Sequence, residues 1–283
     1  MSLVAAIGDI HGRFERVEAW LRELEQAHGQ KLELAIAVGD LETFVAAEDP
    51  LRKRQKRTGA AEFGPYASGA KAMPCPLVFL GGNNEDFAPL HEMQQGGELA
   101  KGVRYLGRAG ATTLASASVA FLSGIFAPTS FERPLEPPRT LELARRAGHF
   151  RRWEVEAVAQ ARDVELLLLH DWPSGLVRRG IIGPEPTPPA FWGNLQASQL
   201  VDALRPSWVL CGHQHRAWAG TLGRGPKPTR VACLDEAERP AGAVLWMQLE
   251  SGEIVRVGWG LSTQPAWERG QPWTAEHAPP PGA

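Results

Sequence analysis

Long apolar runs are absent from this 283-residue sequence. It contains no stretch of about 18 or more apolar residues, the length that a membrane-spanning helix needs. The apolar segment nearest the N-terminus covers only residues 3–7 and leads directly into Asp9. A cleaved signal peptide would remove Asp9, which the motifs described below require. We therefore expect a cytoplasmic protein that does not associate with membranes.

Cysteine and net charge are also low. The three cysteines, Cys75, Cys211 and Cys233, share no short metal-binding spacing, which excludes a thiolate zinc motif and indicates small buried side chains in a reducing compartment. The formal net charge of -2 argues against a generally basic protein that coats nucleic acid. A hydrophobic content of 43% is ordinary for a globular protein with a substantial core.

What the sequence does contain is a series of metal-ligand residues that follow apolar, strand-like runs. The runs lie at residues 3–7, 34–38, 77–80, 166–169 and 208–211. The polar residues that follow them are Asp9, His11, Asp40, Asn83, His170, His213 and His215. In an open α/β sheet, ligand-binding groups gather at the carboxyl ends of the strands. All five segments can therefore converge on one site.

The residue types in this series favour a particular kind of metal site. Carboxylate oxygens, an amide oxygen and neutral imidazoles suit divalent Mn, Fe or Zn. Seven ligands are too many for one ion, but they suffice for two ions if one carboxylate bridges. Two ions about 3.5–4 Å apart are the arrangement used in phosphoester hydrolysis. We therefore predict two divalent metal ions.

The motifs resemble the calcineurin-like metallophosphoesterase superfamily, whose pattern is D-x-H, GD, GNH[E/D], H and GHxH. The resemblance implies a metallophosphoesterase fold, an α/β two-sheet β-sandwich flanked by helices, with the metal site at the strand C-terminal ends. It implies that the first ion is held by Asp9, His11, Asp40 and His215. The second ion would be held by Asp40, Asn83, His170 and His213, with Asp40 as the bridge.

The stretches between the motifs are similar to the RNA lariat debranching enzyme family. They include GGNNEDF, GVRYLGRAG, FLSGIF, HDWP and LRPSWVLCGHQH, in the same order, over roughly residues 3–250. The segment at about 127–150 looks like that family's recognition loop. The resemblance implies a metal-dependent phosphodiesterase that acts on a nucleic acid or nucleotide phosphoester, with a 2′-5′ linkage as a candidate bond.

Two positions depart from the debranching pattern. Asp9 stands where that family carries cysteine, so the first metal site is complete. Asn84 stands where GNHE has its catalytic histidine; it can orient a phosphate by hydrogen bonding but cannot donate a proton. A phosphomonoesterase or nucleotide pyrophosphohydrolase therefore stays open, as does a catalytically impaired, metal-holding RNA-binding module. Glu85 and Asp86 are expected to form a solvated acidic turn before the next helix.

Four residues are candidates for substrate binding. His149, Arg151 and Arg152 lie in or beside the recognition-type loop, and Trp172 follows His170. An exposed loop histidine, a solvated charged face and a tryptophan packed in the site floor are the structural alternatives. A second basic segment, residues 51–57, carries five cations and could steer a phosphate backbone or form a solvated helix face. The sequence leaves the oligomeric state open.

The expected organisation is one domain, residues 1–260, with a C-terminal tail, 261–283, that is partly disordered. Helices are predicted at about 13–28, 141–162 and 198–204. Strand-like runs at 103–106, 112–114 and 119–123 are expected to start a second, mostly antiparallel sheet. Late strands at 230–234, 243–249 and 254–258 are expected to complete that second sheet.

Overall fold

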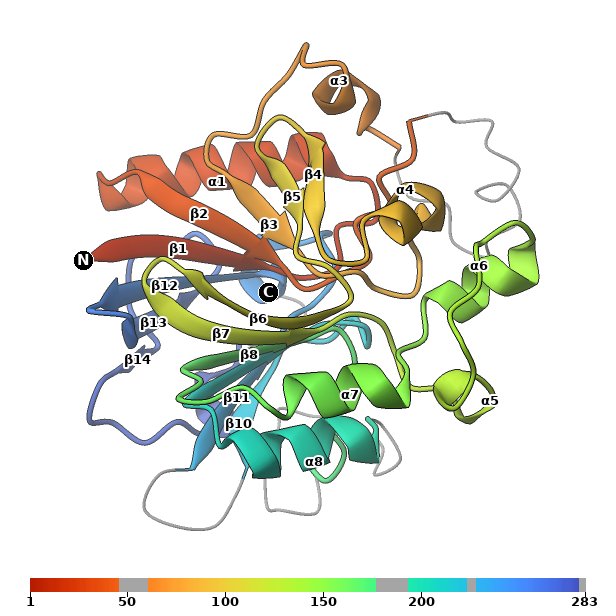
Figure 1. Cartoon of the computed structure of the whole chain (residues 1–283). Coiled ribbons are helices and arrows are strands. Elements are labelled where there is room, and N and C mark those ends of the chain that lie inside the picture. The colour runs from red at the N-terminus through yellow and green to blue at the C-terminus, as the bar shows by residue number, and fades with distance from the viewer. Residues whose placement is uncertain (46–60, 177–192, 223–227, 280–283) are drawn as a thin grey trace.

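A computed structural model describes residues 1–45, 61–176, 193–222 and 228–279 of the chain. Two β-sheets pack face to face, and helices cover both outer faces (Figure 1). The predicted α/β two-sheet fold is therefore confirmed. The basic segment at 51–57 lies outside the described residues.

Within the described residues, the first sheet has eight strands in the order β14-β13-β12-β1-β2-β3-β5-β4. Its central strands β1, β2, β3 and β5 are parallel to one another, and β12 pairs antiparallel with β1. The strands are β1 (Ser2–Ile7), β2 (Leu32–Ala37), β3 (Leu77–Phe79), β4 (Gly97–Ala100), β5 (Val103–Tyr105), β12 (Val244–Glu250), β13 (Glu253–Trp259) and β14 (Trp267–Glu268).

The second sheet has six strands in the described part of the chain, in the order β10-β11-β9-β8-β7-β6. The pairs β7–β8, β8–β9 and β9–β11 are parallel. The strands are β6 (Ala109–Leu114), β7 (Ala117–Leu122), β8 (Leu166–Leu169), β9 (Trp208–Cys211), β10 (Trp218–Leu222) and β11 (Thr229–Cys233). Parallel strands place their carboxyl ends at one edge, so β8 and β9 deliver their following loops to the same place.

Helices are amphipathic or short, and the longer ones cover the sheets (Figure 1). α1 (Phe14–His28) buries Phe14, Val17, Leu21 and Leu24, a helical spacing that places one face on the first sheet. α7 (Arg152–Val158) and α8 (Leu195–Leu204) cover the second sheet. The other helices in the described residues are α3 (Gly64–Ala67), α4 (Phe87–Glu92), α5 (Pro128–Phe131), α6 (Leu141–Ala147), α9 (Pro240–Ala243) and η1 (Ala275–His277).

The central strands are buried on both faces, by helices on one side and by the other sheet on the other. On β1, Leu3 and Ala5 point to the helix side, whereas Val4 and Ala6 point to the space between the sheets. Alternating side chains on a strand face opposite ways, so a strand covered on both sides must be apolar throughout. This is why the runs before each motif residue are continuous rather than alternating.

Three sequence expectations about topology are wrong. The run at 103–106, expected in the second sheet, is β5 of the first sheet and pairs with β3, and the late strands β12 and β13 also join the first sheet, where β12 pairs with β1. Among the described strands, the second sheet has three parallel and two antiparallel pairs, so it is not mostly antiparallel. The helix expected at 141–162 is two helices, α6 and α7, because His149 leaves the helix to bridge Ile125.

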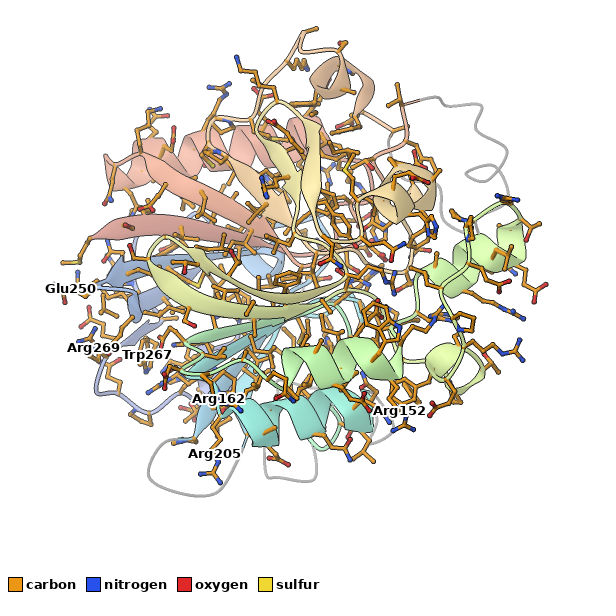
Figure 2. The ribbon with its side chains drawn as sticks, in the orientation of Figure 1. Arg152, Arg162, Arg205, Glu250, Trp267 and Arg269 are labelled. Atoms are coloured by element: carbon orange, nitrogen blue, oxygen red, sulfur yellow. The ribbon has the colours of Figure 1, made fainter. Side chains whose placement is uncertain are left out.

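The segment after residue 260 packs on the sheets. Trp267 begins β14, which pairs with β13, and Trp273 is 3% exposed with its indole N–H donating to Val231 O at 2.9 Å. Figure 2 shows Trp267 on the side of the molecule opposite Arg152. Residues 280–283 are outside the described part, so the expected disorder of the tail stays a prediction, as does the domain boundary at residue 260.

Candidate metal centre

The polar residues that follow β1, β2 and β9 meet at one point. One ligand atom from each of Asp9, His11, Asp40 and His215 lies within 4.8 Å of the others. The backbones of His11, Asp40 and His215 have φ of 47°, 50° and 50°, in the left-handed region. Non-glycine residues held there cost about 1–3 kcal/mol each, and such strain gathers at functional sites.

Electron-rich atoms converge inside this group. The Nε2 atoms of His11 and His215 are 3.0 Å apart, and His215 Nε2 lies 2.9 Å from Asp9 Oδ2. The Nδ1 atoms face other carboxylates, that of Glu42 at 2.7 Å and that of Glu236 at 3.2 Å. When Nδ1 carries the proton, each Nε2 presents a lone pair to the shared space. A divalent cation with oxygen and imidazole ligands fits this arrangement.

The same space attracts a proton when it holds no cation. Burial alone would lower the pKa of His11, but its hydrogen bond to Glu42 and the charges of Asp40 and Asp9 raise that pKa to about 9. The pKa of His215 is also raised, since Asp9 outweighs the effect of burial. Metal binding at these rings therefore competes with protonation.

A second group forms around His170, which follows β8. His170 Nδ1 donates to Val38 O at 2.8 Å, so Nε2 carries a lone pair that faces Asn83 Oδ1 at 3.1 Å and Asp40 Oδ1 at 3.4 Å. The ring of His213 lies 5.1 Å from that of His170, centroid to centroid. Burial and the neighbouring His170 lower the pKa of His213, which favours the neutral form that binds metal.

Asp40 belongs to both groups. It is 1% exposed, and although burial opposes ionisation, the nearby His170 and His11 and two hydrogen bonds from Asn84 hold its pKa at about 2. The Asn84 backbone N–H donates to Oδ1 and its side-chain amide donates to Oδ2, both at 2.7 Å. Asn84 therefore orients Asp40 in this structure, in addition to any contact with a phosphate.

Glu85 corrects one expectation. It is 1% exposed rather than solvated, and its carboxylate accepts hydrogen bonds from the backbone N–H groups of Leu41, Glu42 and Gly82 at 2.9–3.1 Å. Burial and the charge of Asp40 raise the pKa of Glu85 to about 8. Glu85 thus ties the turn after β3 to the turn that carries Asp40.

Sequence reasoning missed two carboxylates of the centre, Glu42 and Glu236, which face the imidazoles of His11 and His215. A signal was present in the sequence. Each glutamate follows an apolar strand by a few residues, as the motif residues do, and such positions lie at the same sheet edge.

The recognition-type loop lies against the second group. Gly148 packs so closely on Asn83 that an added Cβ would be 2.9 Å from its Cα. Buried Arg108 holds this part of the loop by donating to Ala147 O and His149 O, both at 2.7 Å. The loop therefore borders the centre through its backbone.

The four substrate-binding candidates differ in accessibility. His149 is partly buried, with Nδ1 2.9 Å from Ser130 Oγ. Arg151 is 2% exposed, and its guanidinium donates to the carbonyls of His149 and Arg146. This structure therefore presents the His149 ring near the surface but uses Arg151 to hold the loop.

Arg152 and Trp172 contrast in the same way. Arg152 is exposed at the start of α7, pairs with Glu132 and lies over the Phe131 ring at 5.0 Å (Figure 2). Trp172 is 1% exposed and stacks on Trp218 with centroids 5.7 Å apart. The Trp172 ring is therefore packed in the hydrophobic core, whereas the Arg152 side chain is exposed.

Comparison with known proteins identifies the family. The pattern of the calcineurin-like phosphoesterase domain matches residues 2–217. This chain belongs to the calcineurin-like phosphoesterase family. The resemblance inferred from the motifs is thereby confirmed, and this phosphoesterase family implies divalent metal ions, for which the Asp9, His11, Asp40 and His215 group is suited.

Curated relatives of this calcineurin-like phosphoesterase are named lariat debranching enzymes. The Drosophila melanogaster protein is 30% identical over 77% of this chain and 44% of its own length. The Arabidopsis thaliana protein is 28% identical over 82% of this chain and 60% of its own, and the Caenorhabditis elegans protein is 29% identical over 93% and 58%. The chain thus spans about half the length of the relatives it matches.

Solved structures agree on the fold. TT1561 of Thermus thermophilus aligns with a TM-score of 0.55 and 13% identity over 92% of this chain and 99% of that chain. GAP50, described as the anchor in the inner membrane complex of Plasmodium, aligns with a TM-score of 0.51 and 8% identity over 93% and 85%. Among the helices described in the present chain, none is long and apolar enough to cross a membrane.

Proposed function

We propose that this chain is a dinuclear metal-dependent phosphodiesterase, a hydrolase that acts on ester bonds. The placement of Asp40 carries the proposal. Its carboxylate belongs to the group of Asp9, His11 and His215, and its Oδ1 also lies 3.4 Å from His170 Nε2. A carboxylate shared between two groups of ligand atoms supports two ions close together.

The proposed ligand sets follow the two groups. The first ion takes Asp9, His11, Asp40 and His215; the second takes Asp40, Asn83, His170 and His213. Oxygen and imidazole donors suit Mn, Fe or Zn. When bound, two such ions polarise the phosphate and lower the pKa of the attacking water. The protein contributes by holding the proposed ligands in strained turns and by lowering the pKa of His213, whereas at His11 and His215 the metal must displace a proton.

Asn84 leaves the site without the general acid that the family's histidine supplies. Its amide can donate a hydrogen bond to a phosphate oxygen, but it cannot protonate a leaving group, a contribution worth about 10²–10⁴ in rate. This favours a second candidate, a phosphomonoesterase or nucleotide pyrophosphohydrolase whose leaving group departs unprotonated. A metal-holding RNA-binding module without turnover is the third candidate, for the same reason.

Nucleic acid is the proposed substrate, with a 2′-5′ linkage as a candidate bond. Support comes from the relatives named lariat debranching enzymes and from the loop at about 127–150, whose Gly148 packs on Asn83. Arg152 is available beside this loop for phosphate contacts, because an exposed ion pair such as that with Glu132 contributes only about 0–1 kcal/mol and exchanges easily.

Hydrolysis of bis-p-nitrophenyl phosphate and p-nitrophenyl phosphate with added Mn²⁺ tests the proposal. We expect preference for the diester, with Asp40→Asn lowering turnover about 10³-fold or more, equivalent to about 4 kcal/mol. Branched and linear oligonucleotides then test the substrate. Preference for the monoester would support the second candidate. Turnover that appears only in Asn84→His would contradict the enzyme proposal and support a binding module.

A further inference from the structure

We propose that Glu42 is a positioning residue that makes the first metal position the tighter of the two, so that one ion stays resident while the second exchanges. The proposal rests on the dinuclear function proposed above. Glu42 is not one of the residues proposed to hold either ion. It acts through His11, whose Nδ1 lies 2.7 Å from Glu42 Oε1.

Glu42 is held in place by the fold. Its side chain is 1% exposed, although glutamate is rarely buried without a strong partner. Its φ is 55°, a left-handed conformation that costs a residue with a side chain about 1–3 kcal/mol. Its backbone N–H donates to Glu85 Oε2 at 3.0 Å, which fixes the turn. Because the Glu42 backbone is fixed and its carboxylate is buried, the hydrogen bond to that carboxylate holds the His11 ring in one orientation.

His11 and His215 of the first position differ from His170 of the second in what stands behind the imidazole. In the first position, His11 faces Glu42, and His215 faces Glu236 at 3.2 Å. In the second position, His170 donates to the neutral carbonyl of Val38, and the nearest Asp9 oxygen is 4.0 Å from its Nδ1. Charge-assisted hydrogen bonds are about twice as strong as neutral ones.

A carboxylate behind a ligating imidazole has two effects. It holds a proton on Nδ1, which leaves Nε2 as the atom that binds the metal, and it makes the ring a stronger donor. Loss of such a partner typically lowers metal affinity roughly 10- to 100-fold. Glu236 supplies the same contact to His215 but is 22% exposed and more distant, so its effect should be smaller than that of Glu42.

Equilibrium dialysis of the metal-free chain against Mn²⁺, with bound metal counted by atomic emission, tests the proposal. We expect wild type to bind two ions with separate affinities. Glu42→Gln keeps the size of the side chain and removes its charge, so it should weaken the tighter ion about 10- to 100-fold and leave the weaker ion unchanged. Glu33→Gln, an exposed glutamate on β2, is the matched control and should change neither.

The visible absorbance of bound Co²⁺ gives a second readout, because it should change for the first ion added to Glu42→Gln and not for the second. If Glu42→Gln lowered the affinity for both ions equally, or did not lower the affinity for the tighter ion, the proposal would be overturned. The proposed function would still stand in that case if the protein hydrolysed the diester in the presence of Mn²⁺. Failure of wild type to bind Mn²⁺ or hydrolyse the diester would overturn both. If Glu42→Gln does not fold, Glu236→Gln tests the same metal position. We expect it to lower the affinity for the tighter ion by a smaller factor, and an unchanged affinity would overturn the proposal.

Discussion

Backbone strain is concentrated in single residues around the centre. His11, Asp40, Glu42, His213 and His215 all have positive φ, between 47° and 69°. Each costs roughly 1–3 kcal/mol and persists because hydrogen bonds around it over-determine the turn. The turns that carry the proposed ligands are therefore held in place without an ion, and part of the stability of the sandwich offsets that strain.

His149 makes the loop sensitive to acid. Burial, followed by the charges of Arg151, Arg108 and Arg146, lowers its pKa to about 4. Between pH 6.5 and 4 the His149 side chain binds a proton in the unfolded chain but not in the folded chain. The contribution of neutral His149 to the free energy of unfolding is therefore fully present above about pH 6.5 and is lost as the pH falls to 4. Partial exposure limits the effect to about 1–2 kcal/mol.

Urea unfolding of His149→Gln against wild type at pH 7 and pH 4.5 measures this effect. We expect the difference in unfolding free energy between the two proteins to shift in favour of the variant at the lower pH. A difference that does not depend on pH would show that His149 titrates normally in the folded protein.

At the scale of elements, the turn after β3 sets the position of Asp40. A Cβ on Gly82 would lie 2.0 Å from Asp40 Oδ1 and 2.4 Å from its backbone nitrogen. Gly82→Ala should therefore displace the carboxylate and lower kcat/KM for the diester by about 10²-fold or more. Gly29→Ala, at the end of α1 with φ of 60° and open space around it, should cost about 1 kcal/mol of stability without changing kcat/KM. Wild-type kcat/KM in Gly82→Ala would contradict this account of the turn.

The contact between α7 and the recognition-type loop depends on a buried ion pair. Arg108 and Glu154 are 6% and 0% exposed, and the Arg108 guanidinium donates to both carboxylate oxygens. Glu154→Gln leaves a buried charge uncompensated and should lower the free energy of unfolding by about 3–5 kcal/mol. Hydrogen exchange should also become faster in residues 141–151.

The exposed pair of Glu132 with Arg152 supplies the control for that prediction. Glu132→Gln should cost about 0–1 kcal/mol, because solvent screens the pair. If Glu132→Gln and Glu154→Gln lowered the free energy of unfolding equally, the buried pair of Arg108 with Glu154 would not be what holds the loop.

At the scale of the whole molecule, the C-terminal segment stabilises the sandwich far from the centre. The ring of Trp273 lies 5.1 Å from that of Trp208, which begins β9, whereas the proposed ligands His213 and His215 follow the end of that strand. Trp273→Ala should lower the free energy of unfolding by about 3–5 kcal/mol and leave Mn²⁺ affinity unchanged. Trp153, which is 48% exposed, is the control, and its change to alanine should cost less than about 1 kcal/mol. Loss of metal in Trp273→Ala would show that the two ends of the sheet are coupled.

Local sequence patterns predicted much of the fold because central strands buried on both faces must be apolar throughout. β1, β8 and β9 were predicted in this way, and α1 was predicted from its helical spacing. The assignment of β12 and β13 to a sheet was wrong, since pairing between residues 2–7 and 244–249 depends on contacts far apart in the chain. The break between α6 and α7 also depends on a distant contact, the bridge from Ile125 to His149.

The sequence by itself determined the family and the convergence of motif residues at strand ends, because motif spacing and strand direction are local properties. Only the tertiary structure decided what surrounds those residues. It buried Trp172 and Arg151, turned Glu85 inward, and placed Glu42 behind His11. These outcomes depend on packing between segments that are distant in the chain, whereas the chemistry of a ligand atom is already present in its residue type.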